Sequence, residues 1–430
     1  MLSRLKLPAR NTPGIRRGPG IHSSSASKRH RLRVSISRTR PLVAVCLATS
    51  LLGVDPQLHV LAMPVVSEAF RAGPTENAVL RSLATVVLAV TMLGAGRWSQ
   101  RWGLRRAAVL AAAALTGSSL LSALAWDVPS LATGRLVTGA ATAVLFAAGL
   151  AVLAGNYRGR ALTIACSMWL AWDAAAILLA GPLGGDLVDA AGWRSAYMLT
   201  ALAAALACGA CRVLLHPVPG QRKFPGTRIL PLLRHRGFLA AGLAGLGFNF
   251  SNGFFLGAYP ILGAAAGIPT ATVGLVTALI GGGSVFGALI AGFARGCLRL
   301  NGRAMYLSGL GLLVTAGVAQ TLISPATLVT VPLLGCLVVG AAVMWVQQPQ
   351  SELMFEIAGP SRTAAVAPVK TSLGQLGMAA GLAAASPVLS LFDSAGALGS
   401  YAAGSVVAAV VPFAAAVTVV ILLWQNPRGD

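Results

Sequence analysis

Charged residues are scarce in this chain. They make up 10% of its 430 residues, and only 11 residues are Asp or Glu, whereas about a quarter of a soluble domain is charged. Hydrophobic residues make up 56% and the mean hydropathy is +0.76, which excludes a water-soluble fold. A formal net charge of +22 is typical of nucleic-acid-binding proteins when the chain is soluble, so its meaning depends on where the basic residues lie.

The sequence also lacks the signatures of catalysis and of a disulfide framework. It contains no HExxH, GxSxG or Walker sequence, so neither an enzyme nor a nucleotide-driven pump is indicated. Five of the six cysteines fall inside apolar runs, where we expect them to be reduced. Cys208 and Cys211 form a CxxC without a second Cys or His pair nearby, which indicates core thiols rather than metal ligands. We therefore expect no cofactor, and a proton gradient as the source of energy.

Long apolar runs are abundant. A bilayer core about 30 Å thick requires roughly 20 apolar residues in a helix. Twelve such runs lie at 41–64, 78–97, 105–126, 130–153, 161–183, 193–215, 237–260, 270–293, 303–323, 327–347, 368–391 and 401–424. The basic, proline-containing stretch 216–236 separates two halves, 41–215 and 237–424. This pattern predicts an all-α integral membrane protein with twelve transmembrane helices in two pseudo-symmetric six-helix bundles.

The basic residues fall almost entirely on one side of these spans. Lys and Arg in short loops stay cytoplasmic, and with the amino terminus inside, only Arg71, Arg81 and Arg194 face outward. The net charge therefore reports topology and gives no evidence for a nucleic-acid partner. We expect both termini and the linker 216–236 to be cytoplasmic, the carboxy-terminal tail being 425–430.

The amino-terminal segment 1–40 is basic and contains no Asp or Glu. Such a segment buries too little apolar surface to fold alone, which predicts a disordered cytoplasmic tail that contacts anionic lipid. It lacks the apolar core of a secretory signal peptide. Its Arg- and Ser-rich composition also resembles an organellar transit peptide, which is the alternative interpretation.

Five motifs occur in order along the first half, and each is similar to a motif of the major facilitator superfamily or of its drug:proton antiporters. They are Asp55 to Pro64 (D…ALP), GRWSQRWGLRR at 96–106 (GxxxDRxGRR), RLVTGAATA at 135–143 (RxxQGxGxA), GPLGG at 181–185 (GPxxGG) and GWR at 192–194. Three departures are present. Gln100 replaces an Asp, Thr138 replaces a Gln, and the Gly-Pro motif is one residue short.

The resemblance implies the major facilitator fold and secondary active transport by alternating access. It implies proton-coupled export of small lipophilic compounds, cationic or zwitterionic, such as drugs, dyes and secondary metabolites. It further implies a monomer in the cell inner (plasma) membrane, whose partners are a small-molecule substrate, protons and the lipid bilayer.

Three charged residues fall inside the predicted spans and away from the span ends, namely Asp55, Arg135 and Asp173, and His59 follows Asp55 by one turn. Charges at this depth usually face an aqueous cavity or each other. We expect Asp55 or Asp173 to carry the proton and the substrate cation, with Arg135 competing for the carboxylate and His59 as a second titrating group. The alternative roles are structural: an ion pair that locks spans one and four, a hydrogen-bonded Asp173, and a histidine that only packs.

Aromatic and amide residues predict the lining of a substrate cavity, because they bind amphipathic molecules by stacking, cation–π contact and adaptable hydrogen bonds. The candidates are Trp169 and Trp172 beside Asp173, Phe248, Asn249, Asn252 and Phe255 in span seven, and Trp345, Gln347, Gln348 and Gln350 at the end of span ten. The alternative for the two asparagines is a hydrogen bond between helices.

Two glycine-containing motifs are predicted to serve the change of state. The loop after span two is expected to latch the cytoplasmic side, and Gln100 in place of Asp weakens that closure; its residues are Gly96, Gln100, Arg101, Gly103, Arg105 and Arg106. The motif of span five is expected to bend that helix or let it approach another closely. Its residues are Gly181, Pro182, Gly184 and Gly185. The alternative is a plain helix end before an outer loop.

Two other functions fit parts of the sequence. A proton symporter that imports an organic anion or nutrient would keep the fold and use Arg135 as a carboxylate clamp. A non-transporting membrane receptor is the more distant alternative. Reduced susceptibility to cationic dyes on expression would indicate export, and accumulation of a labelled nutrient would indicate import.

Overall fold

Long helices account for nearly all of the structure, a computed structural model that describes residues 39–158, 160–216, 235–298, 300–359 and 363–424. The helices are α2 (Leu51–Ala69), α3 (Pro74–Trp102), α4 (Leu104–Ala123), α5 (Val128–Asn156), α6 (Arg160–Ala191), α7 (Arg194–Leu214), α9 (Arg236–Ala265), α10 (Thr270–Gly296), α11 (Gly302–Ala319), α12 (Thr330–Ala358), α13 (Thr363–Leu391) and α14 (Gly396–Trp424). No β-strand occurs in the described ranges. Most of the predicted tail 1–40 and of the linker 216–236, and all of 425–430, lie outside them.

The prediction of an all-α chain with twelve spans is confirmed: in the described ranges, twelve helices are long and apolar enough to cross a membrane. The first is Thr39–Ala69, with a turn at Ser50 that precedes α2. Some helices extend beyond the predicted apolar run. For example, α12 continues to Ala358, past Glu352 and Glu356, because backbone hydrogen bonding does not stop where the apolar pattern stops.

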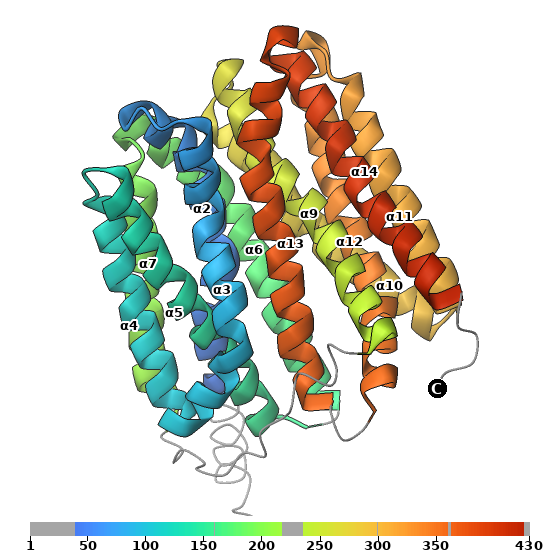
Figure 1. Cartoon of the computed structure of the whole chain (residues 1–430). Helices are drawn as coiled ribbons and strands as arrows, with labels where there is room; N and C mark the ends of the chain where they lie inside the picture. The colour runs from blue at the N-terminus through green and yellow to red at the C-terminus, as the bar shows by residue number, and fades with distance from the viewer. Residues whose placement is uncertain (1–38, 159, 217–234, 299, 360–362, 425–430) are drawn as a thin grey trace, which may run out of the picture.

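The helices α2–α7 form one bundle and α9–α14 form the other (Figure 1). The turn between α2 and α3 lies at the top of Figure 1 and the turn between α3 and α4 at the bottom. We call these the α2–α3 end and the α3–α4 end. The bundles meet where α13 packs along α3, α10 along α6, and α9 beside α2.

Short turns between consecutive helices keep neighbours antiparallel. The α3–α4 turn consists of Gly103 alone, at φ +88°, a backbone conformation that glycine adopts without steric cost. At the start of α5, the Asp127 carboxylate accepts a hydrogen bond from the backbone N–H of Ser130 at 2.8 Å. The hydrogen bonds from Ser130 lower the pKa of Asp127, and this carboxylate caps the positive end of the helix.

Apolar side chains fill the interior and also cover the outside of the bundles. Leu145 lies in the core of the first bundle, and Phe254 and Tyr401 lie in the core of the second. Large apolar side chains such as Leu179 and Leu289 are instead exposed. In water this surface would be unfavourable, whereas lipid solvates it. The chain is therefore a multi-pass membrane protein.

Candidate functional site: a polar cavity between the two bundles

A cavity of about 360 Å³ lies between the bundles, a size typical of small-molecule sites. Its wall is formed mainly by α2 and α6 of the first bundle and by α9, α10, α12 and α13 of the second. Polar side chains from both bundles line it: Gln57, Asp173, Asn249, Asn252, Thr277, Ser284, Gln347, Gln350, Lys370, Thr371 and Gln375. The remainder of the wall is largely apolar, so the cavity suits an amphipathic ligand.

Asp173 is the carboxylate of the cavity wall. It lies on the face of α6 that also presents Leu170, Ala174 and Ile177 to the cavity. Its Oδ1 is buried and has no hydrogen-bond partner among the described residues. Because an unpaired buried carboxylate is unfavourable, Asp173 gains stability from a proton or from the cationic group of a ligand.

The predicted aromatic lining is wrong for this cavity. Trp169 packs against Phe146 with ring centroids 5.4 Å apart, and Trp172 is 46% exposed on the outer face of α6. Phe248 and Phe255 are fully buried in the core of the second bundle. Asn249 and Asn252 do line the cavity. The reason is helical geometry: neighbouring residues point about 100° apart, so the asparagines face the cavity and the two phenylalanines face the core.

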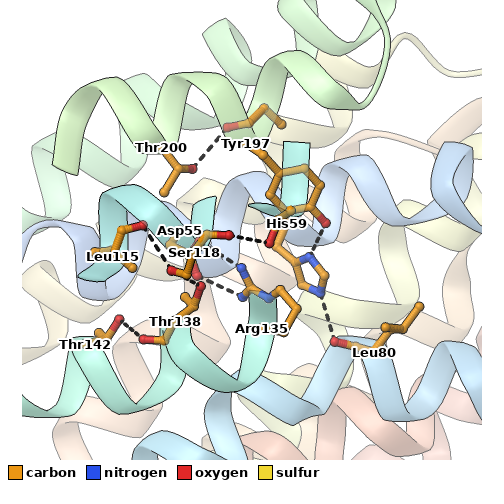
Figure 2. Close-up of polar contacts among 12 residues, drawn as sticks. Asp55, His59, Leu80, Leu115, Ser118, Arg135, Thr138, Thr142, Tyr197 and Thr200 are labelled. Carbon is orange, nitrogen blue, oxygen red and sulfur yellow. Dashed lines mark hydrogen bonds and ion pairs between the residues drawn. The ribbon is translucent and has the colours of Figure 1, made fainter. Parts of the chain in front are cut away.

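Asp55 and Arg135 form a buried ion pair between α2 and α5 (Figure 2). Nη1 of Arg135 donates to Oδ1 of Asp55 at 2.9 Å, and Nη2 donates to Oδ2 at 2.8 Å. Both side chains are at most 4% exposed, and neither residue lines the cavity. Thr138, which replaces the Gln of the family motif, shares a hydrogen bond of 2.9 Å with Ser118 of α4. The Asp55–Arg135 pair thus joins α2 to α5 behind the cavity wall.

His59 does not contact the Asp55 side chain, although it follows Asp55 by one turn. Its Nε2 lies 3.0 Å from the carbonyl oxygen of Leu80 and its Nδ1 lies 2.7 Å from the Tyr197 hydroxyl (Figure 2). Since a carbonyl oxygen only accepts, Nε2 carries a hydrogen. The carboxylate of Asp55 is already held by both arms of Arg135, which leaves the imidazole to connect α2 with α3 and α7.

Arg81 does not face outward, although the charge count places it on the outer side. It lies within α3 and is 3% exposed. Its Nη1 donates to the carbonyl oxygen of Gly257 of α9 at 3.1 Å, so it connects the two bundles. Sequence reasoning missed that α3 already begins at Pro74, seven residues before Arg81. This length of helix places Arg81 inside the protein.

Lys370 is a second charged residue that sequence reasoning missed. The predicted span 368–391 places Lys370 at its cytoplasmic end, but α13 begins at Thr363, so Lys370 lies well inside the helix and lines the cavity. Its Nζ donates to Oγ of Ser351 of α12 at 2.5 Å. The run of small and apolar residues at 364–367 was a signal that the helix starts before Lys370.

The α3–α4 turn makes its described contact within the first bundle. Nη2 of Arg105 donates to the carbonyl oxygen of Arg212 at 2.6 Å, in the last turn of α7, where a positive charge is favourable. Oε1 of Gln100 is buried without a partner among the described residues. Arg101 and Arg106 are exposed, and a Cβ at Gly96 would meet no described atom within 4 Å. The role of the α3–α4 turn as a cytoplasmic latch stays a prediction.

The glycines of α6 bring that helix against the second bundle. A Cβ on Gly181 would collide with the carbonyl oxygen of Gly274 of α10, and a Cβ on Gly274 would collide with that of Gly181. Gly185 lies equally close to the backbone at Thr270, and Gly184 packs on Leu58 of α2. The two backbones therefore touch near the α2–α3 end.

Hydrogen bonds between the bundles also gather toward the α2–α3 end. Asp189 accepts from the backbone N–H of Thr270 at 2.9 Å and from its hydroxyl. Nε2 of Gln57 donates to Oγ1 of Thr277 at 2.7 Å and to the carbonyl oxygen of Gly274 at 3.2 Å. Nearer the middle, Ser372 of α13 donates to the carbonyl oxygen of Ala89 of α3 at 2.7 Å. The α2–α3 end is thus closed.

Comparison with known proteins identifies the family. The model of the Major Facilitator Superfamily matches residues 45–382. The methylenomycin A resistance protein of Bacillus subtilis (strain 168) is 30% identical over 137 residues, which are 32% of this chain and 29% of that protein. The cephamycin export protein of Amycolatopsis lactamdurans is 30% identical over 210 residues, 47% of this chain and 42% of that protein. The chain thus spans less than half the length of either relative.

Solved structures support the fold. A bacterial homologue of the human lysosomal transporter Spinster, in an inward-facing and unoccupied conformation, superposes with a TM-score of 0.75. The match covers 92% of this chain and 99% of that one at 14% sequence identity. At that identity the likeness concerns the arrangement of helices alone.

Proposed function

The chain belongs to the major facilitator superfamily of membrane transporters, and on that premise we propose that it exports small lipophilic compounds, cationic or zwitterionic, in exchange for protons. The observation that carries the proposal is the unpartnered carboxylate oxygen of Asp173 in the wall of the cavity. A proton and a substrate cation compete for such an oxygen. This competition couples proton entry to substrate exit, because a proton that binds Asp173 releases the substrate, and a substrate that binds Asp173 releases the proton.

The names of the relatives support the direction of transport. One is a resistance protein and another an export protein, and a multidrug efflux pump of Mycolicibacterium smegmatis is 24% identical over 159 residues. The cavity supports the chemistry, because its amides and apolar wall suit lipophilic molecules that carry a few polar groups.

The contacts between the bundles support alternating access as the mechanism. The α2–α3 end is closed by backbone contact at Gly181 and Gly274 and by the hydrogen bonds of Arg81 and Asp189. The positive-inside rule favours an orientation with the α3–α4 end in the cytoplasm. In this orientation the structure corresponds to a state closed to the outside, and export requires those contacts to separate.

Import of an organic anion through Arg135 is less well supported. Both arms of the guanidinium are bound to Asp55, and Arg135 does not line the cavity. A carboxylate substrate would have to displace a buried, bidentate partner. The same contacts favour a structural role for the Asp55–Arg135 pair. They leave Asp173 as the candidate for proton exchange.

Transport in proteoliposomes with an imposed pH gradient tests the proposal. Uptake of a lipophilic fluorescent zwitterion, which carries one ammonium and one carboxylate, into vesicles that are acidic inside is expected to require the wild-type carboxylate, and D173N is expected to reduce it at least about tenfold. The control is D393N, which removes an exposed carboxylate from the short 3-10 helix before α14. Undiminished proton-driven exchange in D173N would overturn the proposal.

A further inference from the structure

The cavity wall carries two opposite charges that do not pair with each other. Asp173 lies on α6 of the first bundle and Lys370 on α13 of the second, and both line the cavity. The ion pairs made by the described residues are Asp55–Arg135 and Arg295–Glu352, so Asp173 and Lys370 lie more than 4 Å apart. No other Asp, Glu, Lys or Arg lines the cavity in the described part of the chain.

The contacts of Lys370 leave hydrogen-bonding capacity. An ammonium group has three N–H donors, and the contact described for Lys370 is a single one, to Oγ of Ser351. That hydroxyl in turn donates to the carbonyl oxygen of Gln347 at 2.5 Å, so Ser351 fixes the position of the ammonium without neutralising it. A cation at this depth is costly unless an anion accompanies it.

An amide of the cavity wall has an acceptor without a partner. Gln350 of α12 lines the cavity and is 3% exposed. Its Nε2 donates to the carbonyl oxygen of Ala241 at 2.6 Å, which fixes the orientation of the amide. Its Oε1 is buried and has no partner among the described residues. The wall therefore offers a cation at Lys370, an anion at Asp173 and an unused acceptor at Gln350.

We infer that the cavity selects zwitterions: Lys370 binds an anionic group of the substrate, such as a carboxylate, while Asp173 binds its cationic group. This inference rests on the proposed function and narrows its substrate class. The reason is charge balance. A purely cationic ligand neutralises Asp173 but leaves the charge of Lys370 uncompensated and is repelled by it. A purely anionic ligand neutralises Lys370 but leaves the charge of Asp173 uncompensated and is repelled by it. A ligand that carries both charges neutralises the whole cavity, and each charge-assisted hydrogen bond adds affinity.

Three matched fluorescent probes test the inference by equilibrium binding to the full chain in lipid nanodiscs, without a pH gradient. They are a piperazinyl fluoroquinolone, which has one carboxylate and one ammonium, its ethyl ester, which lacks the carboxylate, and its N-acetyl derivative, which lacks the ammonium. We expect the wild-type chain to bind the parent compound at least about tenfold more tightly than either derivative.

Variants assign each charge to its residue. K370Q is expected to abolish the preference for the parent over the ester and to keep the preference over the N-acetyl compound. D173N is expected to have the opposite effect, and K370R should restore most of the wild-type selectivity. R97Q, which removes an exposed basic residue of α3, is the control and should bind like the wild type.

Three results would overturn the inference: no binding of any probe, equal or tighter binding of the ester by the wild type, or equal weakening of parent and ester in K370Q. The last result would assign Lys370 to packing or to a pairing with Asp173 in another state. A failure of the proposed function can be told apart from a failure of this inference. In that case the chain would bind zwitterions selectively in nanodiscs but show no proton-driven exchange in proteoliposomes.

Discussion

Arg135 holds Asp55 through two parallel hydrogen bonds of 2.8 and 2.9 Å, buried between α2 and α5. Two charges removed from water depend on each other, because the loss of one leaves the other without compensation. The pair lies behind the cavity wall rather than in it. Its mutual dependence leads to the first prediction.

Neutralising one partner is expected to cost more stability than neutralising both. D55N leaves a buried guanidinium unpaired, at a cost of about 3–5 kcal/mol, and R135Q leaves a buried carboxylate. The double variant D55N/R135Q should melt at a higher temperature than either single variant in detergent micelles. Additive losses in the double variant would show that the two side chains are energetically independent.

Loss of the hydroxyl is expected to destabilise the fold at Tyr197, which contacts His59, and not at Tyr306. Y197F removes the hydroxyl that lies 2.7 Å from Nδ1 of His59 and leaves a buried polar atom unsatisfied, so a loss of about 1–3 kcal/mol is expected. The hydroxyl of Tyr306 is buried without a partner among the described residues, so Y306F should be neutral or stabilising. Thermal unfolding of the two variants measures the difference, and equal destabilisation would contradict it.

The contact between Gly181 and Gly274 predicts a defect in closure. G181A places a methyl group against a backbone carbonyl that cannot move without its helix, so the α2–α3 end should close poorly and transport should fall at least about tenfold. G117A is the matched control, since a Cβ there meets no described atom within 4 Å. Labelling of a cysteine introduced at the α2–α3 end should increase in G181A and stay at the wild-type level in G117A.

The cap of α5 predicts a pH dependence of stability. The pKa of Asp127 is lower in the folded chain because Ser130 donates hydrogen bonds to its carboxylate. A group whose folded pKa is lowered stabilises the fold above its unfolded pKa, about 4, and loses that contribution as the pH falls through the folded value. The melting temperature of the wild type should therefore exceed that of D127N at pH 6, and the difference should shrink toward pH 3. A difference independent of pH would contradict this assignment.

Properties that depend on position along the chain were predictable from the sequence. The number of spans follows from apolar length, and a partner for Asp55 follows from the presence of one basic residue at a similar depth. His59 shows the limit of this reasoning. Its spacing favoured Asp55, but the carboxylate was already bound by Arg135, and the ring contacts Tyr197 and Leu80 instead.

The cavity lining was less predictable, because it depends on which face of each helix turns toward the other bundle. Asn249 and Phe248 are adjacent in sequence, yet one lines the cavity and the other is buried in the core. Lys370 and Arg81 lie near the ends of the spans predicted from hydropathy, whereas the helices begin earlier and continue through polar residues as long as neighbours satisfy them.

The hydrogen bond from Ser372 to Ala89 has a mechanical consequence. Ala89 lies at the middle of α3, so the bond joins the bundles near mid-height, while the other inter-bundle hydrogen bonds described lie nearer the α2–α3 end. Half of α3 is a lever arm of roughly 22 Å, and a rocking of about 15° moves its tip by about 6 Å. The midpoint hardly moves. We therefore expect the hydrogen bond between Ser372 and Ala89 to persist while the contacts at the tips separate.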